Sequence, residues 1–398
     1  MKLHPGRGLL FLLVVAFGPA RADLGPGSAE GRAHAYRDDA GLYVSSLEGD
    51  WEHPLAAAWS LRLRTVADWI TILSPAAPDG ADAHAGHAGQ THDHAEEEDN
   101  TAAADAVSGA SARVLAGAAD AREFRAGGGL GISWRGRQGN SPVTLSLDAR
   151  GSHEPDYRSA SAALSGSIAL FQSNTVIGGF AGMGRDRIDP PEAPPGQAGL
   201  WPADQTKLSG GLSVFQSLTP RLAVSGGASA GFQGGRLSSP YRNALVGITY
   251  FPERLPGERL RATAFAAAAY YLGWGTALHV RDGLYADDWG VRAWIPETAL
   301  AKESGRWLMT LRHRFYAQGR ADFYRPVYPD RSGYQTGDLR LGRLYDQSGA
   351  LAIEYRLASG ANPIRLSAEY AFSHLEYPDL YPRTLLSHVF TFGIRTEY

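Results

Sequence analysis

The chain has 398 residues, with 48 glycines, no cysteine and a formal net charge of -3. The lack of cysteine excludes a disulfide framework, a thiolate metal site and a cysteine nucleophile. The near-neutral charge argues against a nucleic-acid partner, which requires a basic surface. A mean hydropathy of -0.24 argues against a polytopic helical membrane protein, but it is compatible with a membrane β-barrel, whose strands expose only half of their residues to lipid.

Residues 1–22 have the features of a cleaved export signal. Basic residues precede the apolar run from Leu9 to Phe17, which is too short to span a bilayer comfortably. The small-x-small tripeptide at 20–22 is typical of a cleavage site, so we expect the mature chain to begin at Asp23. A signal anchor is the alternative interpretation. Export is the first requirement for a protein of the Gram-negative outer membrane.

Apolar and polar residues alternate over most of the mature chain, which is the pattern of β-strands with one apolar face. Residues 57–398 therefore predict an all-β fold, a single closed antiparallel transmembrane barrel of about 14 strands. We expect residues 23–56 to form an N-terminal periplasmic segment with one extra strand near 41–51 as an alternative, so 12 or 16 strands remain open. The predicted strands are 57–72, 121–135, 142–153, 159–171, 175–188, 206–217, 221–234, 259–271, 275–286, 290–301, 307–323, 338–357, 363–375 and 385–398.

The connections between these strands alternate in length. With both chain ends in the periplasm, every short connection lies on the periplasmic side, and every long one lies outside. Such asymmetry is typical of outer-membrane barrels. The long connections are 74–120, 189–205, 235–258, 324–337 and 376–384.

The last predicted strand ends on an aromatic residue. This pattern resembles the signal read by the outer-membrane assembly machinery, so we expect that machinery and the membrane lipid as partners, and no nucleic acid. The residues of the apolar face are Phe390, Phe392, Ile394, Thr396 and Tyr398.

The loop 74–120 is rich in histidine and acidic residues. Neutral imidazoles suit Zn, Cu or Ni, and neighbouring carboxylates can complete a coordination shell. The spacing is too irregular to identify one metal, and a solvated insertion without a specific role is the alternative. The candidate ligands are His84, His87, His92, His94, Glu96, Glu97, Glu98 and Asp99.

Many charged residues fall on the predicted lumen face. Two interpretations stay open: the charges line an ion-selective pore, or they pair across strands and fill a blocked barrel. The mixed signs favour pairing. The residues are Arg62, Arg64, Asp148, Arg150, Arg312, Arg314, Arg320, Asp322, Arg340, Glu354, Arg356, Arg365, Glu369, Arg395 and Glu397.

We do not expect an enzyme. An outer-membrane hydrolase needs a serine and a histidine two residues apart on one strand. Ser387 and His388 are adjacent, so their side chains point to opposite faces of the strand.

Six motifs, in order and with matching spacing, resemble the exported β-barrel family catalogued as domain of unknown function 3570. They are DAVSGAS at 105–111, SHEPDYRS at 152–159, NTVIGGF through GRDRIDP at 174–190, SSPYR at 238–242, YADDWG at 285–290 and RFYAQGRADFY at 314–324. The resemblance implies an outer-membrane barrel and, by association, periplasmic redox proteins as partners. The chain departs from the family pattern at Asp282, where an aromatic residue is usual, at Ala112 in place of proline, and in the histidine-rich insertion.

Residues of these motifs gather at the loop-side ends of the predicted strands. They form either an extracellular ligand or partner site, or an interfacial aromatic belt with turn-stabilising carboxylates. They are Glu154, Asp156, Tyr157, Tyr241, Arg242, Asp287, Asp288, Trp289, Asp322, Phe323 and Tyr324.

The leading functional hypothesis is a channel or conduit for a small solute or metal ion, linked to envelope redox or metal work. The alternative is a blocked structural or partner-binding barrel that serves a periplasmic redox assembly. An outer-membrane hydrolase is the third hypothesis.

Overall fold

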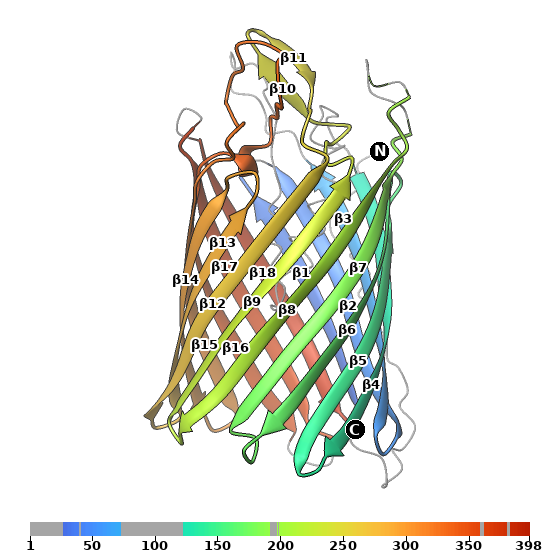
Figure 1. Cartoon of the computed structure of the whole chain (residues 1–398). Coiled ribbons are helices and arrows are strands. Elements are labelled where there is room, and N and C mark those ends of the chain that lie inside the picture. Colours follow the sequence, from blue (N-terminus) through green and yellow to red (C-terminus); the bar gives the residue numbers. More distant parts are fainter. Residues whose placement is uncertain are drawn as a thin grey trace, which may run out of the picture.

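The chain folds into one closed antiparallel barrel of sixteen strands (Figure 1). The computed structural model describes residues 27–39, 41–72, 122–191, 197, 199–358, 362–379 and 383–398. The barrel strands are β1 (Ser28–Asp38), β2 (Leu42–Ala56), β3 (Trp59–Ile72), β4 (Arg122–Gln138), β5 (Ser141–His153), β6 (Tyr157–Leu170), β7 (Thr175–Ile188), β8 (Ala203–Thr219), β9 (Leu222–Gly235), β12 (Glu258–Gly273), β13 (Thr276–Asp287), β14 (Arg292–Ser304), β15 (Trp307–Gln318), β16 (Leu344–Ala358), β17 (Ile364–Tyr377) and β18 (Arg383–Glu397). A separate hairpin, β10 (Asn243–Val246) and β11 (Thr249–Pro252), and a 3₁₀ turn, η1 (Leu339–Leu341), lie in the connections.

The sixteen strands include two that the sequence analysis places in the periplasm. Both β1 and β2 come from the segment 23–56, and β1 pairs with β2 on one side and β18 on the other, which closes the barrel. The register of β1 with β18 runs from Ser28 opposite Glu397 to Asp38 opposite Ser387. The strand count is therefore 16, one of the two counts that the sequence left open beside about 14. The outward positions of β1 are mostly alanine and glycine, which give only a weak apolar alternation.

The outer surface of the barrel is apolar although it is exposed. Phe390, Phe392 and Ile394 on β18 are 47%, 61% and 49% exposed. Aromatic pairs lie near both ends of the outer surface, such as Trp307 with Tyr355, whose ring centroids are 4.5 Å apart. An apolar band with aromatic residues at its borders is the lipid-facing surface of an outer-membrane barrel. Within the described residues, no helix is long and apolar enough to cross a bilayer.

The two ends of the barrel differ. At one end the described connections are turns of two to four residues, at 57–58, 139–140, 171–174, 220–221, 274–275 and 305–306, whereas the other end has three short turns, at 39–41, 154–156 and 288–291, and the long connections. The connections 189–202, 236–257 and 319–343 lie at the other end, where Figure 1 shows β10 and β11 rising above the barrel. Short turns face the periplasm and long loops face outside in such barrels. We therefore refer to these as the periplasmic and extracellular ends.

Candidate functional site

The periplasmic half of the lumen carries ion pairs that remain accessible to water. Arg62 and Arg64 on β3 contact Asp50 on β2 at 2.6 and 3.1 Å. On the other side of the β1–β18 pair that closes the barrel, Arg365 on β17 lies 3.6 Å from Glu354 and 3.6 Å from Glu397. Their side chains are between 21% and 34% exposed. Charges of both signs thus line a hydrated part of the lumen.

Several carboxylates at the extracellular end are almost completely buried. The side chains of Asp68 and Glu154 are 0% and 2% exposed, and that of Asp287 is 0% exposed. Arg125 lies between the first two, with its Nε 3.7 Å from Asp68 and 3.8 Å from Glu154. The lumen is therefore filled at this end and water-accessible at the other.

The connection between β15 and β16 contributes to this filling. Its residue Leu339 belongs to an apolar cluster with Ile295, Tyr316 and Leu344 on the inner wall of the barrel. The side chain of Gln318, the last residue of β15, donates from Nε2 to the carbonyl oxygen of Gly342 at 2.9 Å. These contacts fix the start and the end of the connection against the barrel wall.

A charged network joins this connection to the hairpin segment 236–257. The guanidinium of Arg242 lies 3.0 Å from Asp338 and 3.6 Å from Glu253. Asp338 also accepts from Nε of Arg340 at 2.9 Å. Burial raises the pKa of Asp338, but Arg242 and Arg340 lower it more strongly, so its pKa lies well below the usual range. Asp338 is therefore an ionised anchor between two loops.

A second link ties the hairpin segment to the β5–β6 turn. The hydroxyl of Tyr241 donates to Asp156 at 2.6 Å. In the same turn, burial raises the pKa of Glu154 to about 7, against the lowering effect of Arg125. The turn thus holds one carboxylate that is hydrogen-bonded and one that titrates near neutral pH.

The β13–β14 turn is packed equally tightly against the β15–β16 connection. Gly290 has a φ of +90°, and a Cβ there would clash with the Asp322 carboxylate. The backbone N–H of Asp322 donates to the carbonyl oxygen of Trp289 at 2.9 Å. Glycine is required both by the backbone conformation and by this close approach.

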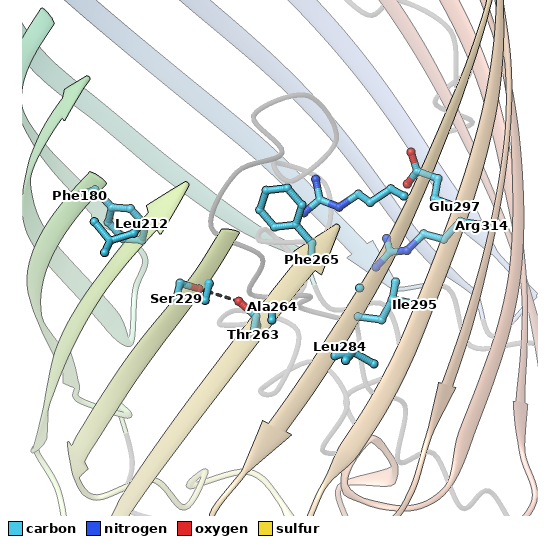
Figure 2. A pocket seen from close by; sticks show the side chains of 13 residues that line it. Phe180, Leu212, Ser229, Thr263, Ala264, Phe265, Leu284, Ile295, Glu297 and Arg314 are labelled. Carbon is cyan, nitrogen blue, oxygen red and sulfur yellow. Dashed lines mark hydrogen bonds between the residues drawn. The ribbon is translucent and has the colours of Figure 1, made fainter. Parts of the chain in front are cut away.

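The lumen wall has two contrasting sides. The inward positions of β6–β9 are mostly serine, glycine and alanine, whereas those of β12–β15 carry arginines. Figure 2 shows Glu297 and Arg314 on the second wall, and Phe265 between them and the Ser229 hydroxyl, which is 2.6 Å from the Thr263 hydroxyl. Arg281 lies over the Phe265 ring, 4.2 Å from its centroid. Small side chains on one wall leave room in front of the charged wall.

A family profile described as "Protein of unknown function (DUF3570)" matches residues 22–377. The chain belongs to this family. The family motifs at 152–159 and 238–242 meet through the hydrogen bond between Asp156 and Tyr241, and those at 285–290 and 314–324 meet at Gly290 and Asp322. These four motifs of this DUF3570 protein therefore pack in two pairs at the extracellular end.

Solved structures resemble the chain at low identity. A bacterial polysaccharide outer membrane secretin has 12% identity and a TM-score of 0.47, with 94% of this chain and 99% of that chain covered. OmpT of Vibrio cholerae with its loop L8 deleted has 9% identity and a TM-score of 0.42, with 94% and 98% covered. The ferric enterobactin receptor of Pseudomonas aeruginosa has 13% identity and a TM-score of 0.41, with 88% and 53% covered. A search of curated proteins gives no match.

Three of the predicted lumen residues lie elsewhere. Because β15 ends at Gln318 and β16 begins at Leu344, Arg320, Asp322 and Arg340 lie in the extracellular connection instead of on strands. The remaining lumen candidates lie on barrel strands. Arg62, Arg64, Asp148, Glu354, Arg356, Arg365 and Glu397 have opposite charges within 4 Å, while Arg150, Arg312, Arg314, Glu369 and Arg395 occupy inward positions of their strands.

The predicted rim residues lie at the extracellular end of the barrel, where several of them are packed inward. Trp289 and Tyr324 are 6% and 2% exposed and share an apolar cluster with Leu341. Asp287 accepts from the backbone N–H of Trp289 and of Val291, as a turn-forming carboxylate does. Asp288, Tyr157 and Arg242 belong to the same end of the barrel.

The candidate metal ligands, from His84 to Asp99, and the signal segment 1–22 lie outside the described residues. Among the residues that the structure does describe, no group of three or more His, Cys, Asp or Glu side chains is placed to hold a metal ion. Ser387 is 5% exposed, whereas the neighbouring His388 bonds the Tyr370 hydroxyl at 2.8 Å in an exposed pair. Tyr398 follows β18 and pairs through its backbone with Gly27.

Several site residues were not predicted. Asp68, Arg125 and Asp186 lie inside the extracellular end. Asp68 interrupts an otherwise apolar segment of β3, and that interruption is the signal that would identify it. Arg125 and Asp186 are flanked by other charged residues, so no such signal marks them. Asp282, where the family usually has an aromatic residue, lies on the outer surface and accepts from Nε1 of Trp294 at 2.6 Å.

Proposed function

We propose that the protein is an outer-membrane conduit for small polar solutes, open to the periplasm and closed at its extracellular end by its own loops. A barrel of sixteen strands has a bore wide enough for an aqueous channel unless side chains or loops fill it. The loops around Arg242 and Asp338 supply that filling at one end only.

The difference in exposure between the two halves of the lumen carries this proposal. Lumen carboxylates such as Asp50 and Glu354 are 28% and 32% exposed, whereas Asp68 and Asp287 at the other end are fully buried. A barrel with a purely structural role does not require a water-accessible half. A conduit whose extracellular end can open requires both a water-accessible lumen and a closure that can move.

The two walls of the lumen favour a polar solute. Serine hydroxyls on β6 and β9 and arginines on β13 and β15 offer hydrogen-bond donors along the bore. A role in envelope redox or metal work stays a proposal that rests on the family resemblance alone.

Solute entry into proteoliposomes tests the proposal. The purified protein is reconstituted, and swelling is followed with sugars and amino acids of increasing size. We expect slow swelling with the wild type and faster, size-dependent swelling once residues 321–341 are replaced by a Gly-Ser-Gly linker. Swelling equal to that of empty liposomes for both proteins contradicts a conduit.

The tight packing of the extracellular end favours a second candidate, a blocked barrel that presents its outer loops to a partner. The ionised Asp338, held by Arg242 and Arg340, fixes the outer loops relative to each other. This candidate predicts no solute entry even after the loop is replaced.

A further inference from the structure

Three arginines gather on the outer surface at the extracellular ends of β6 and β7. Arg158 on β6 lies directly opposite Arg187 on β7, and Arg185 lies two residues before Arg187 on the same face of β7. The neighbouring strand β5 places His153 opposite Arg158. The strands β5 to β7 lie side by side in the barrel (Figure 1). We call Arg158, Arg185 and Arg187 the arginine patch.

The arginine patch points toward the membrane and not into the lumen. Met183, on the same face of β7 as Arg185 and Arg187, is 62% exposed, and Leu164, on the same face of β6 as Arg158, is 56% exposed. Asp186, between the two β7 arginines, points inward and is 2% exposed. The patch therefore follows directly after the lipid-facing apolar surface, at the height where headgroups begin.

The charges of the patch are only partly balanced within the protein. Arg185 bonds Asp204 on β8 at 3.0 Å, and these side chains are 71% and 44% exposed. Asp204 also lies directly opposite Arg187 in the register of β7 with β8, so one carboxylate serves both arginines of β7. The four side chains carry 3 − 1 = +2 charges. Like charges directly opposite each other across two strands are destabilising. An anion between Arg158 and Arg187 would turn this repulsion into attraction.

We propose that the arginine patch binds a phosphate group of the glycolipid in the outer leaflet of the outer membrane. Guanidinium groups bind phosphate through paired N–H donors, and this geometry suits two arginines that project in parallel. The acyl chains of the same lipid would lie on Met183 and Leu164. Basic clusters at headgroup height are a recurrent mode of anionic lipid recognition. This inference needs only the position of the barrel in the membrane and is independent of the conduit function.

Lipid binding to the purified protein in detergent tests the inference. The probes are diphosphoryl lipid A, fully dephosphorylated lipid A and inorganic phosphate, and retention is measured by native mass spectrometry. The test variant is Arg158→Gln with Arg187→Gln, and the matched control is Arg221→Gln at the exposed periplasmic turn. A Lys/Lys double variant keeps the charge but not the paired donors.

We expect the wild type to bind diphosphoryl lipid A at least about tenfold more tightly than the dephosphorylated lipid, the size of one charge-assisted hydrogen bond. The Gln/Gln variant should lose this preference, Arg221→Gln should keep it, and Lys/Lys should fall between them. Equal binding of the two lipids, or an unchanged preference in a folded Gln/Gln variant, overturns the inference. Displacement of the lipid by millimolar inorganic phosphate identifies a general anion site and overturns the lipid assignment.

Discussion

At the residue scale, the buried carboxylates of the extracellular end determine how the stability of the loops depends on pH. Asp338 is ionised between two arginines, whereas Glu154 lies 3.8 Å from Arg125 and has a pKa raised to about 7. These two carboxylates therefore respond differently to pH. Asp338 stabilises the loops over the whole physiological pH range, whereas Glu154 destabilises the folded protein as it ionises.

Replacing Glu154 should change how stability depends on pH. Because the pKa in the folded protein is above the ordinary value of 4.5, the contribution of Glu154 is fully present below about pH 4.5 and is lost as pH rises through about 7. The loss is on the order of 3 kcal/mol when ionisation is complete. We expect Glu154→Gln to match the wild type at pH 4 and to be more stable at pH 8.

Urea unfolding in detergent micelles at the two pH values measures this difference. Asp189→Asn, at the nearby exposed position that follows β7, is the control. An identical pH dependence of the wild type and Glu154→Gln would show that Glu154 is not the titrating group.

At the scale of single strands, inward and outward positions should differ sharply. Leu164 lies on the outer face of β6 and is 56% exposed, and Ser165 is the next residue on the inner face. Arginine on the lipid face near the midplane costs about 2–4 kcal/mol, whereas lumen positions tolerate charge. We therefore expect Leu164→Arg to reduce stability by about that amount and Ser165→Arg to have little effect.

Refolding into lipid vesicles, followed by the fraction folded at increasing urea concentration, checks this prediction. A reversed order, with Ser165→Arg the less stable variant, would mean that the lumen is packed at this depth. That result would also weaken the conduit proposal.

The strands were largely predictable from the sequence, and the packing of the loops was not. Alternation in β18, with Phe390 and Phe392 on one face, identifies the lipid side directly. The weak alternation of β1 hides that strand because its outward positions are small. The contacts of Arg242 with Glu253 and Asp338 join residues from separate loops, and no spacing in the sequence reveals such contacts.

At the scale of the whole molecule, the barrel combines a hydrated periplasmic half with a closed extracellular end. The closure is built from three connections that meet at Asp156, Arg242 and Asp338. Its removal should leave the sixteen strands paired, because β15 and β16 pair with each other along their full length. The function of the barrel therefore depends on whether a continuous aqueous path lies beneath the closure.

Single-channel conductance in planar bilayers tests this central claim most directly. We compare the wild type, Arg242→Ala, and the variant in which residues 321–341 are replaced by a short linker, with Arg221→Ala as the control. The account predicts a small or intermittent current for the wild type and the control, more frequent opening for Arg242→Ala, and a steady, several-fold larger current for the loop replacement. A loop replacement that inserts as a folded barrel and carries no current would contradict it.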